Sequence, residues 1–215
     1  MDGRRARGER TRLRVLEALL SLVEDGEIRP TAQEVATKAG VALRTVYHHF
    51  EDVEALRRIA HDLQVSRHIE LLQPVDTSTE LEERSKLVAR QLRKLFEAIT
   101  PIRRATLLDE QQSPELAEEL RKTRSFRRAH VTSTFAPELA SLGDDKNLVD
   151  ALDQATSWQG WNYLRNDLGR SVPACEKTLA TSIERLLGAG AGAGAHAGAT
   201  PPRRVLAARK STARS

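Results

Sequence analysis

Apolar residues recur at intervals of three and four positions along most of this chain, the spacing that gathers side chains on one face of an α-helix. Runs of alternating β-branched residues, which predict half-buried strands, do not occur. The sequence therefore predicts an all-α protein of about nine helices. We expect helices near residues 11–25, 31–39, 42–49, 52–72, 80–99, 101–111, 114–135, 147–166 and 173–187.

Local signals mark the ends of several predicted helices. Gly26 follows the first, where a left-handed C-terminal cap favours glycine. The stretch T-A-Q-E from Thr31 to Glu34 is a capping box, in which the Thr31 hydroxyl accepts from the Glu34 amide and the Glu34 carboxylate reaches back. Asp52 is a candidate cap for the fourth helix, and Ser113 precedes a proline at the first position of another.

The net charge of +4 is distributed unevenly. Residues 1–14 carry +4, residues 188–215 carry +5, and the body between them carries −5. We expect residues 1–10 to be a basic disordered arm and residues 188–215 to be a Gly/Ala-rich disordered tail. The basic side chains of the first segment lie along nucleic-acid phosphates, lie in a minor groove, or stay solvated. They are Arg4, Arg5, Arg7, Arg10, Arg12 and Arg14. The tail adds weak non-specific affinity or none.

Composition and motifs argue against several classes of protein. No run of about 18 apolar residues is present and the Arg-rich start lacks a signal peptide's apolar segment, so we expect no membrane partner. The single cysteine, Cys175, cannot form an internal disulfide, which fits the cytoplasm. No phosphate-binding glycine loop, zinc-protease motif or nucleophile elbow occurs, so we expect neither an enzyme nor a cofactor. His48 and His49 diverge by about 100° on a helix, so we expect no metal site.

The stretch from Thr31 to Phe50 is typical of a helix–turn–helix. Val35 and Ala36 face inward on its first helix, and Gly40 permits the positive φ of a tight turn. Val41, Val46 and Phe50 are predicted to be buried. The second helix then presents an arginine, a threonine, a tyrosine and a histidine outward, and these residue types suit a helix that enters a DNA major groove. They are Arg44, Thr45, Tyr47 and His48.

The same residues resemble the TetR/AcrR family of bacterial transcriptional regulators. The resemblance runs from Arg12 to about Leu56, through V-L-E-A-L-L-S-L-V-E-D-G, T-A-Q-E-V-A-T-K-A-G-V, R-T-V-Y-H-H-F and E-D-V-E-A-L. It implies a helix–turn–helix domain at residues 11–56, a connecting fourth helix at 53–72, and a helical domain for effector binding and dimerisation at 73–187. The implied function is that of a ligand-responsive repressor, a homodimer that binds a pseudo-palindromic double-stranded DNA operator and an unidentified small-molecule effector.

The resemblance also implies a set of DNA contacts. They are Thr31, Lys38, Ala42, Leu43, Arg44, Thr45, Tyr47 and His48. Thr31 caps its helix and also contacts phosphate, whereas Lys38 contacts phosphate or is plain solvated surface. Arg44 reads a guanine or clamps a phosphate. Val53 stands where the family usually has a phosphate-binding lysine, so that contact is missing here.

Two further sets of residues lie in the larger domain. Two apolar stripes are either dimer interface, as the resemblance implies, or packing within one subunit. They consist of Leu148, Leu152, Ala155 and Gln159 on one helix and of Cys175, Leu179, Ile183 and Leu186 on the last. Phe96, Phe126, Trp158 and Trp161 are candidates for an effector pocket, or are core. A DNA-binding regulator that needs no ligand and a helical protein–protein adaptor remain the alternative functions.

Overall fold

The computed structural model describes residues 2–143 and 145–188. Within these residues the chain forms ten α-helices and no strand, which confirms the all-α prediction. The predicted tail lies almost wholly at residues 189–215, outside the described part. None of the described helices combines the length and the apolarity that crossing a bilayer requires.

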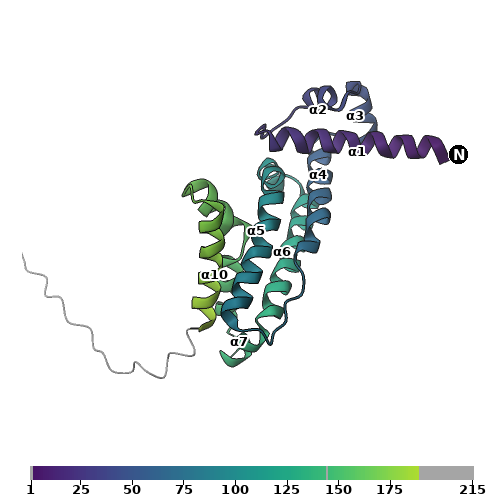
Figure 1. Cartoon of the computed structure of the whole chain (residues 1–215). Coiled ribbons are helices and arrows are strands. Elements are labelled where there is room, and N and C mark those ends of the chain that lie inside the picture. The colour runs from purple at the N-terminus through teal and green to yellow at the C-terminus, as the bar shows by residue number, and fades with distance from the viewer. Residues whose placement is uncertain (1, 144, 189–215) are drawn as a thin grey trace, which may run out of the picture.

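The N-terminal part is a three-helix unit. It contains α1 (Asp2–Glu24), α2 (Ala32–Ala39) and α3 (Leu43–His49), and α4 (Val53–His68) leads from it into the rest of the molecule (Figure 1). The predicted cap of α4 is confirmed, because the Asp52 side chain accepts a hydrogen bond from the Ala55 amide at 2.7 Å. The core of this unit includes Leu16, Leu19, Val35, Ala36, Val46 and Leu56, all buried.

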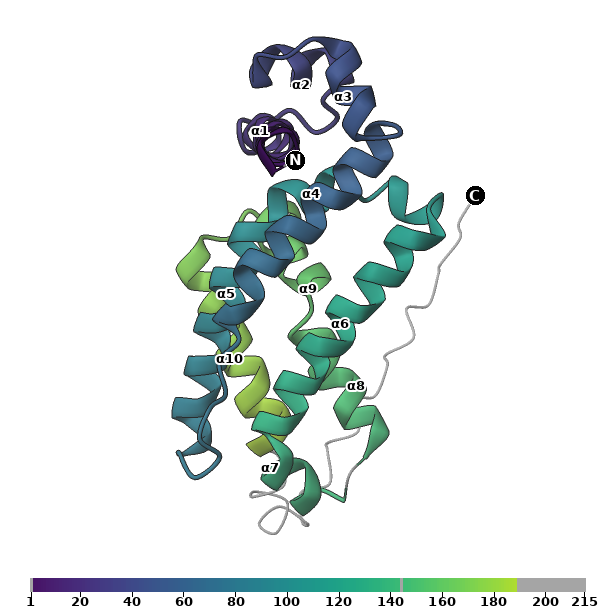
Figure 2. The ribbon, with the colours of Figure 1, turned by 90° about the vertical axis from the view of Figure 1, so that its right-hand side faces the viewer.

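The larger part is a helical bundle built around one long helix, α5 (Leu81–Ala105). Its other helices are α6 (Pro114–Thr134), α7 (Ala136–Ser141), α8 (Lys146–Ala155), α9 (Trp158–Asn162) and α10 (Val172–Gly188). Three short turns join them: η1 (Ile69–Leu71), η2 (Asp109–Gln111) and the π-helical η3 (Tyr163–Asp167). Helix α10 packs along α5, and α6 runs on the other side of the bundle (Figure 2). Ser113 caps α6 ahead of Pro114, as predicted.

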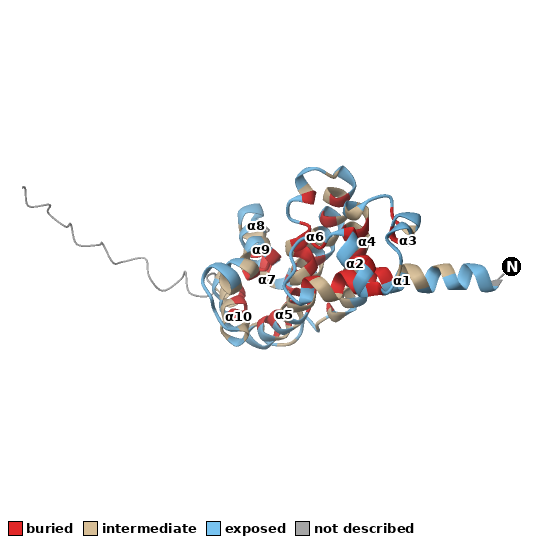
Figure 3. Cartoon of the chain, turned by 90° about the horizontal axis from the view of Figure 1, so that it is seen from above, coloured by how far each residue is buried: buried red, intermediate tan, exposed pale blue. Residues whose placement is uncertain are grey.

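The prediction of a disordered arm at residues 1–10 is wrong for the residues that the structure describes. Helix α1 begins at Asp2, and its first turns project beyond α3 with exposed side chains (Figures 1 and 3). Extending an existing helix costs far less than starting one, because each added residue gains a backbone hydrogen bond. The buried second half of α1 supplies that start, and the Arg7 Nε also donates to the Gly3 carbonyl at 3.2 Å.

The predicted break at Pro101 is also wrong. Helix α5 continues through Pro101 to Ala105, although a proline inside a helix removes one backbone hydrogen bond and costs about 3 kcal/mol. The gain that offsets this cost lies beyond the proline. Ile102 and Ala105 are 1% and 2% exposed and belong to the core of the N-terminal unit, so the end of α5 joins the two parts.

The predicted helix at residues 147–166 is divided. Helix α8 ends at Ala155, and the buried Thr156 and Ser157 turn the chain before α9 starts. The Ser157 hydroxyl caps α9 by accepting from the Gly160 amide at 3.0 Å. A Cβ on Gly160 would lie 3.2 Å from the Gln154 carbonyl oxygen, which is tighter than most Cβ contacts, so glycine suits this close approach.

A buried carboxylate connects the two parts of the molecule. Asp109, in η2, is 2% exposed and accepts two hydrogen bonds from Arg57 of α4, at 2.5 Å from Nε and 2.9 Å from Nη2. Arg29, in the loop before α2, approaches the same carboxylate at 3.4 Å. Asp109 therefore fixes both α4 and the helix–turn–helix against the turn between α5 and α6.

We predict that Asp109→Ala lowers the free energy of unfolding by about 3–5 kcal/mol, because it leaves the buried Arg57 guanidinium without its anion. The measurement is urea denaturation followed by circular dichroism. Glu118→Ala is the control, since Glu118 pairs with Arg121 on the exposed face of α6, and it should change stability by no more than about 0.5 kcal/mol. Equal effects of the two substitutions would contradict the structural role of Asp109.

Candidate functional sites

The start of α2 is held by the predicted capping box, which the structure confirms. The Thr31 hydroxyl accepts from the Glu34 amide at 3.2 Å, and the Thr31 amide donates to Glu34 Oε2 at 2.7 Å. The Thr31 hydroxyl also donates to Glu34 Oε2 at 2.7 Å. The two bonds to the carboxylate, from the Thr31 amide first and from the Thr31 hydroxyl second, lower the pKa of the Glu34 carboxyl. Thr31 is exposed, so its side chain both orders the helix and faces solvent.

The turn between α2 and α3 has the predicted geometry. Gly40 has a φ of 64°, and its amide donates to the carbonyls of Ala36 and Thr37. A residue with a Cβ is strained at this φ, which explains glycine here. Ala36 and Val46 are buried, so the two helices cross closely. This packing holds α3 as a rigid element.

Helix α3 presents its polar face to solvent. Leu43, Arg44, Tyr47 and His48 are exposed, Thr45 is half-buried, and Tyr47 retains 51% exposure. Ala42, at the start of the helix, is also exposed. The side chains predicted to contact DNA from this helix therefore share an accessible surface. Which of them contacts DNA stays a prediction.

Lys38 extends this surface from α2. Its Nζ lies 3.1 Å from the Asp25 carboxylate, and both side chains are exposed. An ion pair in solvent contributes little stability, so this contact does not prevent Lys38 from contacting a phosphate. On the other side of α3, Arg12 of α1 stacks over the Phe50 ring at 5.3 Å. The stacking fixes the end of α3 against α1, and no sequence signal predicted it.

The larger domain buries half of the eight predicted dimer residues in its own core. Leu152, Cys175, Leu179 and Ile183 are at most 1% exposed and form the core with α5. For these four the interface prediction is wrong, because α5 packs against the apolar stripe of α10 and covers it. Burial also raises the pKa of the Cys175 thiol. Leu148 is half-buried against the same core.

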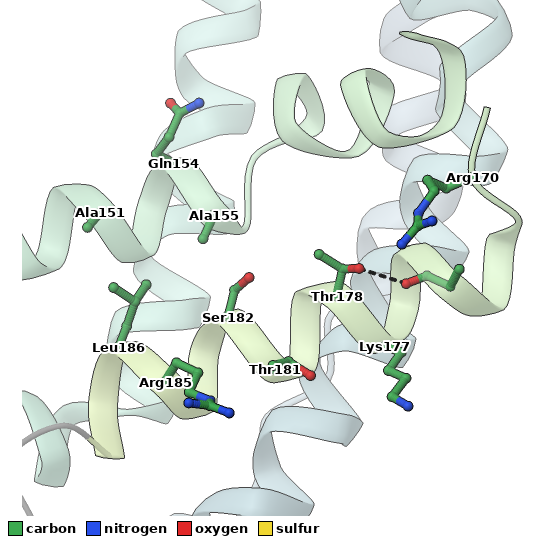
Figure 4. Close-up of a pocket in the computed structure, with 11 residues that line it drawn as sticks. Ala151, Gln154, Ala155, Arg170, Lys177, Thr178, Thr181, Ser182, Arg185 and Leu186 are labelled. Carbon is green, nitrogen blue, oxygen red and sulfur yellow. Dashed lines mark hydrogen bonds between the residues drawn. The ribbon is translucent and has the colours of Figure 1, made fainter. Parts of the chain in front are cut away.

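The other face of α8 and α10 is open. A groove of about 820 Å³ lies between these helices (Figure 4). Small side chains form most of its floor, among them Ala151, Ala155, Ala174 and Ser182, with Leu186 at one end. Of the predicted interface residues, Ala155 and Leu186 line it, and Gln159 is exposed on α9.

The predicted effector-pocket aromatics separate into three kinds. Phe96 and Trp158 line a cavity of about 40 Å³ among α4, α5, α6 and α9. Trp161 is fully buried and packs against Phe96 with ring centroids 6.0 Å apart, but it does not line the cavity. Phe126 is 52% exposed and faces away from this core, so the pocket prediction is wrong for Phe126.

The basic and imidazole side chains of this cavity were not predicted from the sequence, and they are His61, Arg103, Arg124 and Arg127. A signal for Arg103 was present, because it follows Phe96 and Ile99 at intervals of seven and four residues and so stands on the apolar face of its helix. Its guanidinium stacks over the Trp158 ring at 4.9 Å. Among the described residues no group of three or more metal-ligating side chains gathers anywhere.

Comparison with solved structures identifies the fold. A transcriptional regulator from Rhodococcus sp. Rha1 superposes with a TM-score of 0.65 at 21% identity, over 83% of this chain and 96% of that one. A protein titled as a TetR-family transcriptional regulator, from Mesorhizobium loti MAFF303099, gives 0.60 at 22% identity, over 85% and 98%. The chain has the TetR fold.

A transcriptional regulator from Streptomyces coelicolor A3(2) shares the TetR fold, with a TM-score of 0.60 at 21% identity over 82% of this chain and 98% of that one. No family model and no curated protein sequence matches the chain. At these identities the TetR fold is shared while most side chains differ, so the functional residues must be argued from this chain itself.

We predict that Thr31→Ala destabilises the protein by about 1 kcal/mol, because α2 loses its N-terminal cap. Urea denaturation measures the change, and hydrogen exchange should show faster exchange at the amides of residues 32–35. Thr37→Ala is the matched control. The Thr37 hydroxyl donates to the Gln33 carbonyl one turn earlier and accepts from Gln33 Nε2 at 3.4 Å, and both bonds are exposed to solvent, so its loss should have little effect. Equal destabilisation by both changes would contradict the capping role.

Proposed function

We propose that this protein is a DNA-binding transcriptional regulator whose α3 enters the major groove of an operator. The observation that carries the proposal is the exposed polar face of α3, on a helix that a capped α2, a glycine turn and a buried Val46 hold rigid. The TetR fold of the chain, shared with proteins titled transcriptional regulators, supports it. An α-helix fits the major groove, and arginine is the commonest side chain that reads guanine there.

Docking on DNA rests on few charges. Residues 15–70 carry six basic and ten acidic side chains, so this surface is not a general polyanion binder. Arg44, Lys38 and Thr31 are candidates for individual phosphate or base contacts, together with Tyr47 and His48. The exposed arginines of the first turns of α1 add a sequence-independent attraction.

We further propose that two copies associate through the open groove of α8 and α10. Small side chains allow two helices to approach closely, and a two-fold pair places two α3 helices on half-sites about one DNA turn apart. This arrangement replaces the buried stripe of α10 as the interface. It requires that Ala151, Ala155 and Ser182 lie at the contact.

A small molecule bound among α4, α5, α6 and α9 would complete a ligand-responsive repressor. Such an effector changes DNA affinity only if it binds the two arrangements of the protein with different affinity. His61 of α4 lines this cavity, so an occupant contacts the helix that carries the helix–turn–helix.

We predict that Arg44→Ala and Tyr47→Ala each weaken operator binding by about 10-fold or more, the loss expected for one good groove contact. The operator comes from selection of bound genomic fragments, and fluorescence anisotropy at fixed ionic strength gives the affinity. Arg121→Ala and Tyr163→Ala are matched controls on exposed side chains of the larger domain, and they should bind normally.

Unchanged affinity in both α3 variants would show that the reading face is wrongly assigned. Absence of any saturable, sequence-dependent DNA retention by the wild-type protein would instead favour the protein–protein adaptor.

We predict that the protein sediments as a dimer at micromolar concentration and that Ala151→Arg weakens the dimer by about 100-fold, because it places a long cation in a close contact. Analytical ultracentrifugation measures both. Ala129→Arg is the control, since Ala129 is an exposed alanine of α6 outside the groove. A wild-type monomer, or equal dissociation of both variants, would contradict this interface.

A further inference from the structure

The cavity among α4, α5, α6 and α9 combines apolar and basic walls. Leu95, Phe96 and Ile99 of α5 form the apolar side with Leu120 of α6. Arg103, Arg124, Arg127 and His61 supply the polar side. None of the eleven described residues that line it is acidic. The carboxylates that pair with these arginines, Glu110 and Asp153, approach from outside the lining.

Two residues that line this cavity each have a nitrogen atom without a hydrogen-bond partner among the described residues: Nη1 of Arg103 and Nδ1 of His61. Their residues are 4% and 1% exposed. His61 Nδ1 lies 3.6 Å from the Asp62 carboxylate, beyond hydrogen-bond distance. A buried polar group without a partner is costly, and a small polar space of this kind is filled by water or by the acceptor atoms of a ligand. Two such groups on one cavity indicate a missing acceptor.

We propose that this cavity binds an organic monocarboxylate with a compact apolar group, which deepens the effector role proposed above and rests on it. One carboxylate has two oxygens, which accept from Arg103 Nη1 and from His61 when its proton is on Nδ1. The apolar group then packs against Leu95, Phe96 and Ile99. Three arginines line the cavity, whereas two carboxylates, Glu110 and Asp153, pair with them. A neutral alcohol or amide of the same shape would leave one of the three positive charges without a matching anion.

The proposed ligand competes with Glu110. Glu110 Oε2 accepts from Arg103 Nη2 at 2.6 Å, and Oε1 accepts from Arg124 Nη1 at 2.9 Å. Burial acts to raise the pKa of the Glu110 carboxyl, but its bonds to Arg124 and Arg103 outweigh burial, so the pKa is lowered. A ligand carboxylate shares these cations and weakens their hold on Glu110.

Size makes binding and movement inseparable. The cavity measures about 40 Å³, which is smaller than an aromatic ring with a carboxylate. The ligand therefore binds an expanded form, in which Arg103 and Arg124 have moved from Glu110. Because Glu110 adjoins Asp109, which holds Arg57 and Arg29, expansion loosens the contact between η2 and the DNA-binding unit.

The test is equilibrium dialysis of radiolabelled sodium benzoate against the full-length protein, with benzamide as the neutral probe of the same shape. We expect saturable benzoate binding, at least about 10-fold tighter than benzamide, because a hydrogen bond to a charged group is worth more than a neutral one. Arg103→Met should weaken benzoate binding by about 10-fold or more. Quenching or enhancement of the fluorescence of Trp158 and Trp161, the two tryptophans of the chain, should follow the same titration.

Glu110→Gln provides a test that loss of folding cannot mimic. Removing the competing carboxylate should tighten benzoate binding by about 10-fold. Glu119→Gln is the matched control. Glu119 pairs with the exposed Lys122 of the same helix and does not line the cavity, so the substitution should leave the affinity for benzoate unchanged.

Three results would overturn the proposal: benzamide binding as tightly as benzoate, inorganic phosphate binding while benzoate does not, or weaker benzoate binding in Glu110→Gln. None of these readouts involves DNA. If benzoate does not bind while operator binding is intact, only the proposed carboxylate site is disproved. If benzoate binds normally while no operator is bound, the proposed function as a regulator is disproved.

Discussion

The contact between Asp109 and Arg57 determines how the two parts of this molecule are arranged. A buried carboxylate and a buried guanidinium stabilise the fold only when two N–H groups of the arginine point at the two carboxylate oxygens. The pair of Asp109 and Arg57 therefore tolerates little displacement. Apolar packing at Ile102 and Ala105 lies beside it and is far less directional. The orientation of the helix–turn–helix on the bundle is thus set by a polar contact, and the apolar contacts contribute the free energy of burial that holds the two parts together.

Buried arginines perform the same task elsewhere in the bundle. Arg84 of α5 donates to the Thr134 carbonyl at 2.8 Å and pairs with Glu138, which joins α5 to the α6–α7 junction. Arg127 of α6 donates to the Thr156 carbonyl at 3.1 Å and pairs with Asp153 at 2.6 Å, which joins α6 to the end of α8. Helix ends offer unpaired carbonyls, and a long cation satisfies several of them at once. Arg103 differs from these two because its Nη1 is buried without a hydrogen-bond partner among the described residues.

Features that depend on neighbours within one helical turn could be predicted from the sequence. The capping box at Thr31, the left-handed Gly40 and the Asp52 cap belong to this class, and so does the outward face of α3. Contacts between distant segments could not. Helix α5 continues through Pro101 because Ile102 packs in a core formed by residues 15–60, and the stripe at Leu179 is covered by α5. A periodic stripe shows that a helix face is buried, but it does not show which partner buries it.

The continuous α1 has a consequence for how the basic start of the chain can meet DNA. An α-helix with its side chains is about 10–12 Å across, whereas the minor groove of B-DNA is about 6 Å wide. As long as residues 2–10 are helical they cannot thread into that groove as an extended arm would. In the proposed complex with DNA the segment would instead act as a rigid rod, whose position along the sugar–phosphate backbone is set by the packing of Val15 and Leu19 at its buried end. A change in the length of this helical segment would then move its positive charges along the duplex while leaving the proposed base contacts of α3 unchanged.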